Sequence, residues 1–468
     1  MIFEALTWLR LFLFFITIAS FCIVSLSVFV LRLKPWCSCE ICQCFVSSRW
    51  SLKFSNLCDS YSHLLKKSKT GTIRVHILGN IITANPENVE YMLKKRFDNY
   101  PKGKQFSSIL GDLLGGGIFN VDGHLWKFQR KMASLELSNL SVKSYAFEIV
   151  VSEIRSRLFP VFSSFAEFAV AFDLASKLSA ERALTVSPLI WKIKRFFNLG
   201  SEKKLRETIK LLNVLAEELI KHKRNVDVSS HDNLLSRFMA NIDDDKFLRD
   251  IVISFVLAGR DTIASALTTF FWLLSNHPRV MLAIREESDR IMESKTQDVA
   301  SFEQLKEMHY LQAAVHESTR LFPPVQFDSK FCQEDDILPD GTFVAKGTRV
   351  TYHPYAMGRM ETIWGPDCLE FKPERWIQDG IFKQVNPFKY PVFQAGFRVC
   401  LGKEMALVEM KNVALSLIRQ FDIQMANPSH TLKFTPGLTA TVKNGLPVFI
   451  QGINGRTQTI KNLAKNHQ

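Results

Sequence analysis

The sequence predicts a mainly α-helical protein with a small β region and an N-terminal transmembrane helix, in one large domain or in several. Residues 11–31 carry no charge and are long enough to cross a bilayer as a helix. Long apolar runs such as residues 251–274 have the length of buried helices, whereas the alternating segments typical of strands are few and short. The 468 residues would also suffice for two or three ordinary domains, and the 47% hydrophobic content provides for one large core.

The uncharged run lies between Arg10 and the basic pair Arg32 and Lys34. A cleaved secretory signal is shorter and ends in small residues, so the run predicts a retained signal anchor within residues 1–34. Lysine and arginine are more frequent on its C-terminal side, which predicts a cytosolic location for the bulk of the chain. Residues 35–70 would form a linker and the start of the main domain, which would occupy residues 71–468.

The net charge of +13 suits contact with anionic lipid head groups, an acidic partner, or plain solvation of a basic surface. Nine cysteines in so long a chain do not form a disulfide framework. Four of them follow the anchor directly: Cys37, Cys39, Cys42 and Cys44. Zinc ligation, a redox pair and lipidation are open to them, but no second ligand pair or histidine couple follows, so we predict no metal there.

Four segments outside the candidate catalytic motifs predict regular secondary structure. Alternating Ile73, Val75 and Ile77 ahead of Gly79 predict a β-hairpin over residues 72–83. The run Asn85-Pro-Glu supplies an N-cap, an N1 proline and a first-turn acid, so a helix begins there. Residues 438–450 predict strand, turn and strand. From residue 201 a basic amphipathic helix is expected, with this inward face: Leu205, Ile209, Leu212, Leu215 and Leu219.

Trp126 and Arg130 are four positions apart and therefore share one helix face. An indole N–H and a guanidinium can together bind a carboxylate. The spacing alone is more often that of an ordinary amphipathic helix.

Residues 251–274 are apolar except at Arg260, Asp261 and Thr262, which follow Ala258-Gly. The charges argue against a second membrane span, and inside a core helix they need partners or a function. Small residues leave space beside the helix, where a local bulge is typical of functional sites. Asp261 can relay protons, and the Thr262 hydroxyl both donates and accepts. The alternative is that Asp261 caps a new helix.

Glu317 and Arg320 lie on one helix face and can pair, which by itself is usually a surface ion pair. A second arginine, Arg375, follows in a Pro-Glu-Arg run. Further on, residues 393–402 follow the pattern Phe-x-x-Gly-x-Arg-x-Cys-x-Gly and precede an apolar helical run. Amides at the start of such a helix favour a thiolate at Cys400, which suits the axial ligand of a flat cofactor. The alternative is a buried core thiol.

These segments, in this order, resemble the cytochrome P-450 family over nearly the whole chain. The resemblance implies the haem-thiolate monooxygenase fold, with the catalytic domain at residues 71–468 and haem b as cofactor. It implies that Cys400 is the axial ligand of the haem iron, within the loop that contains Phe393 and Gly396. It also implies that the haem propionates are held by Trp126, Arg130, Arg398 and Lys330.

The same resemblance implies that Asp261 and Thr262 deliver protons during oxygen activation. Thiolate ligation of haem iron favours cleavage of the O–O bond. Glu317, Arg320 and Arg375 would form a buried network that locks the haem loop, and breaking such a network would leave an uncompensated buried charge.

Residues 322–330, 352–359 and 399–405 look most like plant family 94, and residues 167–205 and 434–448 look closest to its subfamily C. This implies hydroxylation of the terminal carbon of an acyl chain, with further oxidation to the acid as an extension. The substrate would be a small lipophilic carboxylate: jasmonoyl-isoleucine, its 12-hydroxy form, or a fatty acid. Electrons would come from NADPH through NADPH-cytochrome P-450 reductase, at the endoplasmic reticulum membrane, and no nucleic acid would be bound.

The sequence departs from the family in two places. Phe397 stands where the wider superfamily often has proline, a position that varies in family 94. The chain is also short near residues 160–166, where relatives carry about two more helices of ordinary length, one of them packed against the helix of Asp261. A non-catalytic or misfolded shortened isoform is therefore one alternative. Another is a thiolate-haem isomerase or dehydratase of fatty-acid hydroperoxides, which would not need the Asp261–Thr262 pair.

Overall fold

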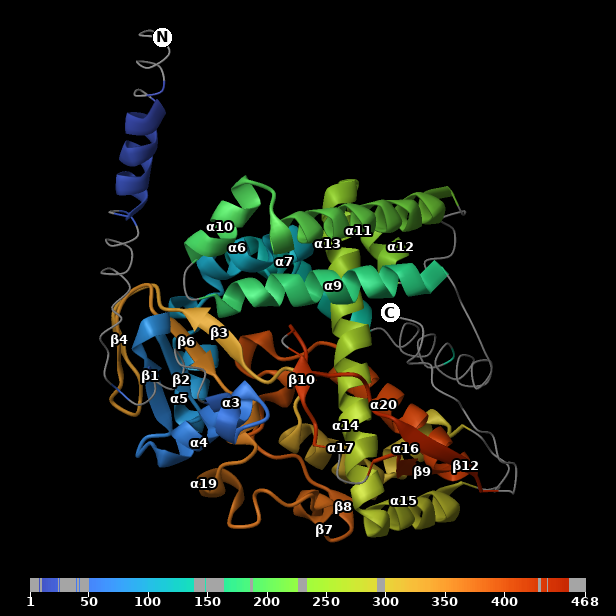
Figure 1. Ribbon diagram of the computed structural model, residues 1–468. Helices are drawn as coiled ribbons and strands as arrows, with labels where there is room; N and C mark the ends of the chain where they lie inside the picture. Colours follow the sequence, from blue (N-terminus) through green and yellow to red (C-terminus); the bar gives the residue numbers. More distant parts are fainter. Residues whose placement is uncertain are drawn as a thin grey trace.

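A helical run from residue 245 to residue 276 crosses the centre of the fold (Figure 1). It comprises α13 (Asp245–Val256), one π-helical turn η4 (Leu257–Asp261) and α14 (Thr262–Asn276). Asp244 begins it by accepting hydrogen bonds from the N–H groups of the first turn. The structure is a computed structural model. It describes residues 8, 11–23, 25, 39, 42, 50–138, 148, 164–185, 188–225, 234–292, 299–427, 431–435 and 437–453.

One layer of helices packs along α14 in the lower half of Figure 1: α15 (Pro278–Ile291), α17 (His309–Leu321) and α20 (Lys403–Gln420). α16 (Phe302–Glu307) packs on α20 and starts with a capping box at Ser301. The apolar faces of these helices meet in one core cluster that includes Phe270, Leu311 and Leu415. Burial of each such side chain stabilises the fold by about 1.5–3 kcal/mol. The cluster therefore holds α14, which begins at Thr262, against α20, which follows Cys400.

A second helical layer covers α13, which is the upper half of the central helical run in Figure 1. It contains α6 (Gly103–Leu114), α7 (Gly123–Ser138), α9 (Ser164–Leu184), α10 (Pro188–Phe196), α11 (Gly200–Asn225) and α12 (Leu234–Met239). The amphipathic helix expected from residue 201 is confirmed as α11, but its buried positions include Leu205, Leu212, Ala216 and Ile220. Leu219 was wrongly placed on this face, since it is 43% exposed and Ile220 takes the inward position.

Four strands form the main sheet in the order β1-β2-β6-β3. They are β1 (Thr72–Val75), β2 (Asn80–Thr83), β6 (Arg349–Tyr352) and β3 (Asp328–Phe331). The antiparallel pairing of β1 with β2 confirms the hairpin expected over residues 72–83. Its turn is longer than expected, because η1 (His76–Leu78) and the left-handed Gly79 separate the strands, so Ile77 lies in the turn.

Short helices precede β1 and follow β2 in the sequence. Asn85 caps α5 (Pro86–Glu90) by accepting from the Glu87 N–H at 2.9 Å, as expected, and the helix continues as η2 (Tyr91–Lys95) and η3 (Phe97–Asn99). Earlier in the chain lie α3 (Trp50–Lys53) and α4 (Leu57–Lys67). α4 packs on α18 (Pro354–Met357), and Leu65 is fully buried in the cluster beside the sheet. The main domain therefore includes part of residues 35–70.

The remaining strands form two-stranded ladders: β4 (Asp336–Ile337) with β5 (Phe343–Val344), β7 (Ile377–Gln378) with β8 (Ile381–Phe382), β9 (Phe421–Met425) with β12 (Val448–Gly452), and β10 (Phe434–Thr435) with β11 (Thr441–Val442). Asn444 and Gly445 make the expected turn, both with positive φ. The strands on either side of this turn do not pair with each other, because β11 and β12 each pair with an earlier strand. Pro447 lacks an N–H, so a ladder cannot continue regularly from this turn.

Residues 11–23 form a helix that lies apart from the rest of the chain in Figure 1, with its apolar side chains exposed. The rest of the anchor expected over residues 11–31 lies outside the described residues, apart from Ser25. Within the described part, one helical run is long and apolar enough to cross a membrane by length and composition alone, Asp245–Asn276. It is the central helix and packs against α17 and α20. Most of the shortened segment near residues 160–166 also lies outside the described part, and α9 begins at Ser164.

Candidate active site

The loop that carries Cys400 is closed by its own backbone. The turns η6 (Pro391–Phe393) and η7 (Gly396–Arg398) lead into it, and the Cys400 N–H donates to the Phe393 carbonyl at 2.8 Å. Gly396 has a φ of +61°, and a Cβ at this position would collide with the carbonyl oxygen of Leu93. Glycine is therefore required here, and the loop leaves Cys400 exposed.

Although solvent reaches one side of Cys400, the protein atoms packed around its sulfur desolvate it and raise the pKa of the thiol, while the Gly402 amide, Arg130 and Lys403 act in the opposite direction. The sequence-based expectation was that amides at the helix start lower the pKa of Cys400, and the Gly402 amide does act in that direction. The expectation left out desolvation of the thiolate, which raises the pKa by more than these groups lower it. A cation bound at the sulfur would favour the thiolate.

Trp126, Arg130 and Arg398 come together beside this loop. Trp126 and Arg130 share one face of α7, and the guanidinium carbons of Arg130 and Arg398 lie 5.7 Å and 4.6 Å from the centroid of the Trp126 ring. Arg130 donates to the Val399 carbonyl at 2.8 Å, and Arg398 pairs with Asp122 at 2.5 Å. Burial lowers the pKa of both arginines, and the charge of Arg398 lowers that of Arg130 further. Two cations this close to one ring would be stabilised by a nearby anion.

Lys330 is fully buried on β3, where its ammonium pairs with Asp328 at 3.0 Å. The ammonium of Lys102 contacts the other oxygen of the same carboxylate. Desolvation by burial would raise the pKa of Asp328, but these two ammonium groups hold it well below its usual range. Burial lowers the pKa of Lys330, and the nearby charges of Lys102 and Arg398 act in the same direction. Lys330 is thus part of the charged cluster at the site, with Asp328 as its direct partner.

The residues present fit the carboxylates of a haem. Arg398 Nε is buried and has no hydrogen-bond partner among the described residues, so one donor in the cluster is free for an acceptor. Lys102, Lys330, Arg130 and Arg398 outnumber the acids they contact. Trp126, Arg130 and Arg398 are therefore the residues that would hold the propionates, and Cys400 would hold the iron. Sequence analysis missed Lys102, since nothing in its local sequence indicates a partner on β3.

The acid–alcohol pair lies at the π-helical turn, as the small residues before it predicted. Asp261 has helical backbone angles and no capping bond, which excludes the alternative of a new helix start. Thr262 Oγ1 donates to the Ala258 carbonyl at 2.5 Å. A Cβ on Gly259 would meet no atom within 4 Å, so space remains beside this turn.

Asp261 pairs with Arg260 at 2.9 Å, and Arg260 pairs in turn with Asp173 on α9 at 2.6 Å. Burial raises the pKa of Asp261 to about 6, although Arg260 opposes the shift. A carboxyl with this pKa exchanges protons readily near neutral pH.

Glu317, Arg320 and Arg375 lie together in a buried network. The Glu317 carboxylate accepts two hydrogen bonds from Arg320 at 2.7 Å and 2.8 Å, and one from Arg375 at 3.3 Å. Arg320 and Glu317 are fully buried, and Arg320 also donates to the Cys368 and Glu370 carbonyls. These contacts connect α17 to η5 (Pro373–Trp376) and to the turns after α19 (Glu361–Trp364).

Trp376 and Tyr390 extend the network towards the Cys400 loop, and sequence analysis missed both. The Trp376 indole donates to Glu317 at 2.8 Å, and its ring lies 4.9 Å from that of Tyr390. Tyr390 bonds Thr319 at 2.6 Å through its hydroxyl and directly precedes η6. The position of Trp376 immediately after Arg375 was the available signal.

A thiol on a closed loop, cations and an indole that fit a carboxylate, and an acid–alcohol pair on a bulged central helix define a haem-thiolate oxygenase. The cytochrome P450 family model matches residues 175–448, which is more than half of the chain. The chain belongs to the cytochrome P450 family.

Three relatives place the chain more closely. It is 53% identical to cytochrome P450 94C1 of Arabidopsis thaliana over an alignment that covers 93% of this chain and 98% of the relative. It is 44% identical to cytochrome P450 94B1 of the same plant, with 84% and 86% covered. It is 40% identical to cytochrome P450 94A1 of Vicia sativa, with 79% and 81% covered.

The chain is therefore a cytochrome P450 monooxygenase that uses thiolate-bound haem, with electrons from NADPH delivered through a reductase. When bound, the haem supplies the activation of dioxygen. Trp126, Arg130 and Arg398 would bind its carboxylates, Cys400 would present one thiol to it, and Asp261 would be the nearest candidate for a proton-exchanging acid on the central helix.

Proposed function

We propose that this monooxygenase hydroxylates the terminal carbon of an acyl chain that carries a carboxylate. Jasmonoyl-isoleucine or its 12-hydroxy form is the preferred substrate, with a fatty acid second, and oxidation continues to the acid. The observation that carries this proposal is the 53% identity to a subfamily 94C protein across almost the whole chain. The sequence resemblance to family 94 supports the substrate class.

Each site residue has a proposed role. Cys400 ligates the iron in the loop of Phe393 and Gly396. Trp126, Arg130 and Arg398 hold the propionates, and Lys330 acts through Asp328 as part of the same charged cluster. Asp261 and Thr262 move protons at the bulge of the central helix. Glu317, Arg320 and Arg375 fix the haem loop through Trp376 and Tyr390.

The protein is proposed to lie in the endoplasmic reticulum membrane with one anchor helix and a cytosolic catalytic domain. The exposed apolar helix of residues 11–23 supports an anchor. NADPH-cytochrome P-450 reductase is the proposed redox partner.

Two alternatives to a monooxygenase are a non-catalytic isoform and an isomerase or dehydratase. The alignment with the first relative extends over 486 positions, more than the 468 residues of this chain, so the relative has residues without a counterpart here. This favours an internally shortened chain and keeps a non-catalytic isoform as the second candidate. Nothing comparable favours an isomerase or dehydratase, and the Asp261–Thr262 pair disfavours it.

The test is a reduced, carbon-monoxide difference spectrum of membranes that contain this chain and the reductase. A red-shifted Soret band is expected, and it should be absent from the Cys400→Ala variant at equal protein level. Absence of the band from wild-type protein present in the membranes would favour the non-catalytic isoform.

Product analysis then compares 12-hydroxy-jasmonoyl-isoleucine, jasmonoyl-isoleucine and a medium-chain fatty acid. We expect product oxidised at the terminal carbon, dependent on NADPH and labelled from ¹⁸O₂. Product formed from a fatty-acid hydroperoxide without NADPH would instead identify an isomerase or dehydratase. Preference for the fatty acid would overturn the substrate assignment but not the reaction.

A further inference from the structure

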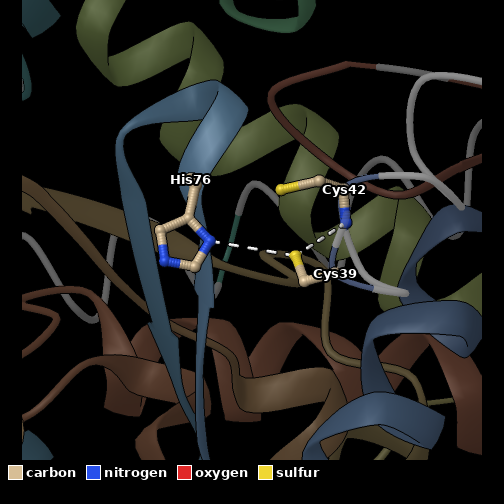
Figure 2. Close-up of side chains that lie close together, drawn as sticks. All are labelled: Cys39, Cys42 and His76. Carbon is tan, nitrogen blue, oxygen red and sulfur yellow. Dashed lines mark hydrogen bonds between the residues drawn. The ribbon is translucent and has the colours of Figure 1, made fainter. Parts of the chain in front are cut away.

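A second cluster of metal-ligating side chains lies far from Cys400 in the sequence. Cys39 and Cys42, from the segment after the anchor, meet His76 at the turn between β1 and β2 (Figure 2). One ligand atom from each of the three residues lies within 4.8 Å of the others. The proposed monooxygenase reaction uses none of them.

The distances are close to those of a metal site. Zinc bound tetrahedrally at about 2.3 Å from sulfur and about 2.0 Å from nitrogen holds its ligand atoms roughly 3.5–3.8 Å apart. Cys39 Sγ lies 3.8 Å from His76 Nδ1. The other separations among the three ligand atoms are at most 4.8 Å.

The backbone also prepares the site. Cys39 and Cys42 have Cys-x-x-Cys spacing, and the Cys42 N–H points to Cys39 Sγ at 3.4 Å, as the dashed line in Figure 2 shows. A hydrogen bond of this kind favours the thiolate, which is the form that binds metal. Cys42 is 2% exposed and Cys39 is half-buried, so both thiols are partly withdrawn from solvent.

His76 is positioned by the hairpin rather than by the cysteine segment. It begins η1, where the Gly79 N–H bonds the His76 carbonyl at 3.1 Å. Val75, directly before it, is fully buried and pairs with Asn80 in the β1–β2 ladder. The imidazole itself is exposed, which leaves room for a further ligand such as water.

We propose that Cys39, Cys42 and His76 form a zinc site. Each thiol would release one proton as it binds, and neutral His76 would bind through Nδ1. A soft divalent metal is chosen because two sulfur ligands and an imidazole suit zinc rather than magnesium or calcium. The metal would link the cysteine segment that follows the anchor to the main sheet. It would therefore restrain the position of the catalytic domain relative to that segment.

The absence of a metal was predicted because no ligand pair follows the cysteines in the nearby sequence. The fold supplies the missing ligand from a turn more than thirty positions downstream. The proposal does not depend on the catalytic activity, and it can be tested in protein with or without haem.

The test measures zinc and iron per chain by mass spectrometry in full-length protein, purified in detergent under reducing conditions without chelator. About one zinc per chain is expected for the wild type. The triple variant Cys39→Ser/Cys42→Ser/His76→Ala should lose it. The control is Cys58→Ser/His63→Ala, which removes a free thiol and an imidazole outside the cluster and should keep its zinc.

A second readout guards against misfolded variants. Cobalt added to the metal-depleted wild type should give the visible absorption bands of a tetrahedral thiolate complex, and zinc should displace them. Wild-type protein without zinc, zinc retained by the triple variant, or a Cys39–Cys42 disulfide in place of the metal would each overturn the proposal.

Discussion

The guanidinium carbon of Arg398 lies 4.6 Å from the centroid of the Trp126 ring, and Arg398 Nε is buried with no hydrogen-bond partner among the described residues. One residue comes from the helix α7 and the other from the Cys400 loop. Their meeting brings a cation and an indole donor to one place, where a carboxylate of the cofactor can be bound.

Removing this cation should weaken haem binding. We expect Arg398→Leu to retain haem about ten- to a hundredfold less tightly, because a hydrogen bond to a charged group contributes about 1.5–3 kcal/mol. Haem transfer to a high-affinity acceptor protein measures the loss. Arg224→Leu removes an exposed arginine paired with Asp245 and is the control. Equal transfer rates for the two variants would contradict the assignment.

Gly396 should not tolerate a side chain. Its φ is +61°, and a Cβ would collide with the Leu93 carbonyl, whereas Gly445 has a φ of +70° and open space around it. Both changes to alanine cost about 1–2 kcal/mol for the left-handed backbone. Only Gly396→Ala should also displace the Cys400 loop and reduce the carbon-monoxide difference band. If Gly445→Ala reduces the band as much, backbone strain alone would explain the effect.

Truncating Glu317 should destabilise the whole fold. Glu317→Ala leaves the fully buried Arg320 without its carboxylate, and loss of one partner of a buried pair costs about 3–5 kcal/mol. We expect a lower midpoint of unfolding in urea together with earlier haem loss. Lys372→Ala removes an exposed partner of Asp367 and should leave the midpoint almost unchanged, because solvent screens such a pair. Similar midpoints for both variants would argue against a buried network.

Asp261 should reduce stability as the pH rises. Burial raises its pKa from 3.8 to about 6, so the neutral carboxyl stabilises the fold fully below about pH 4 and this contribution is lost as the pH rises through 6. The melting temperature of Asp261→Asn should therefore exceed that of the wild type more at pH 7.5 than at pH 5. Thr262→Val removes no titrating group. If its melting temperature relative to wild type rises between pH 5 and pH 7.5 as much as that of Asp261→Asn, the explanation would be refuted.

Asp261 and Thr262 should also control how efficiently oxygen is used. Asp261→Asn and Thr262→Val are expected to lower product formation about a hundredfold, since positioned acid–base groups contribute about 10²–10⁴ in rate. NADPH consumption should fall much less, so product per NADPH drops. The matched control is Thr268→Val on the same helix, whose hydroxyl makes the same bond to a carbonyl four residues earlier. Unchanged coupling in Asp261→Asn would remove Asp261 from the proton path.

Local sequence was sufficient for much of the secondary structure. The N-cap at Asn85, the hairpin over residues 72–83 and the bulge before Asp261 all depend on neighbours a few positions away, and each is present. The same holds for Glu317 with Arg320, because residues three apart on a helix necessarily share a face.

Sequence by itself thus determined the order of the chemical groups along the chain and the family to which it belongs. Tertiary structure alone decided which distant groups meet: Lys102 with Asp328, Trp376 with Glu317, and His76 with Cys39. It also decided that β11 and β12 pair with earlier strands rather than with each other. The physical reason is that hydrogen bonds, ion pairs and strand ladders between distant segments depend on how the apolar faces pack, and no local pattern encodes that packing.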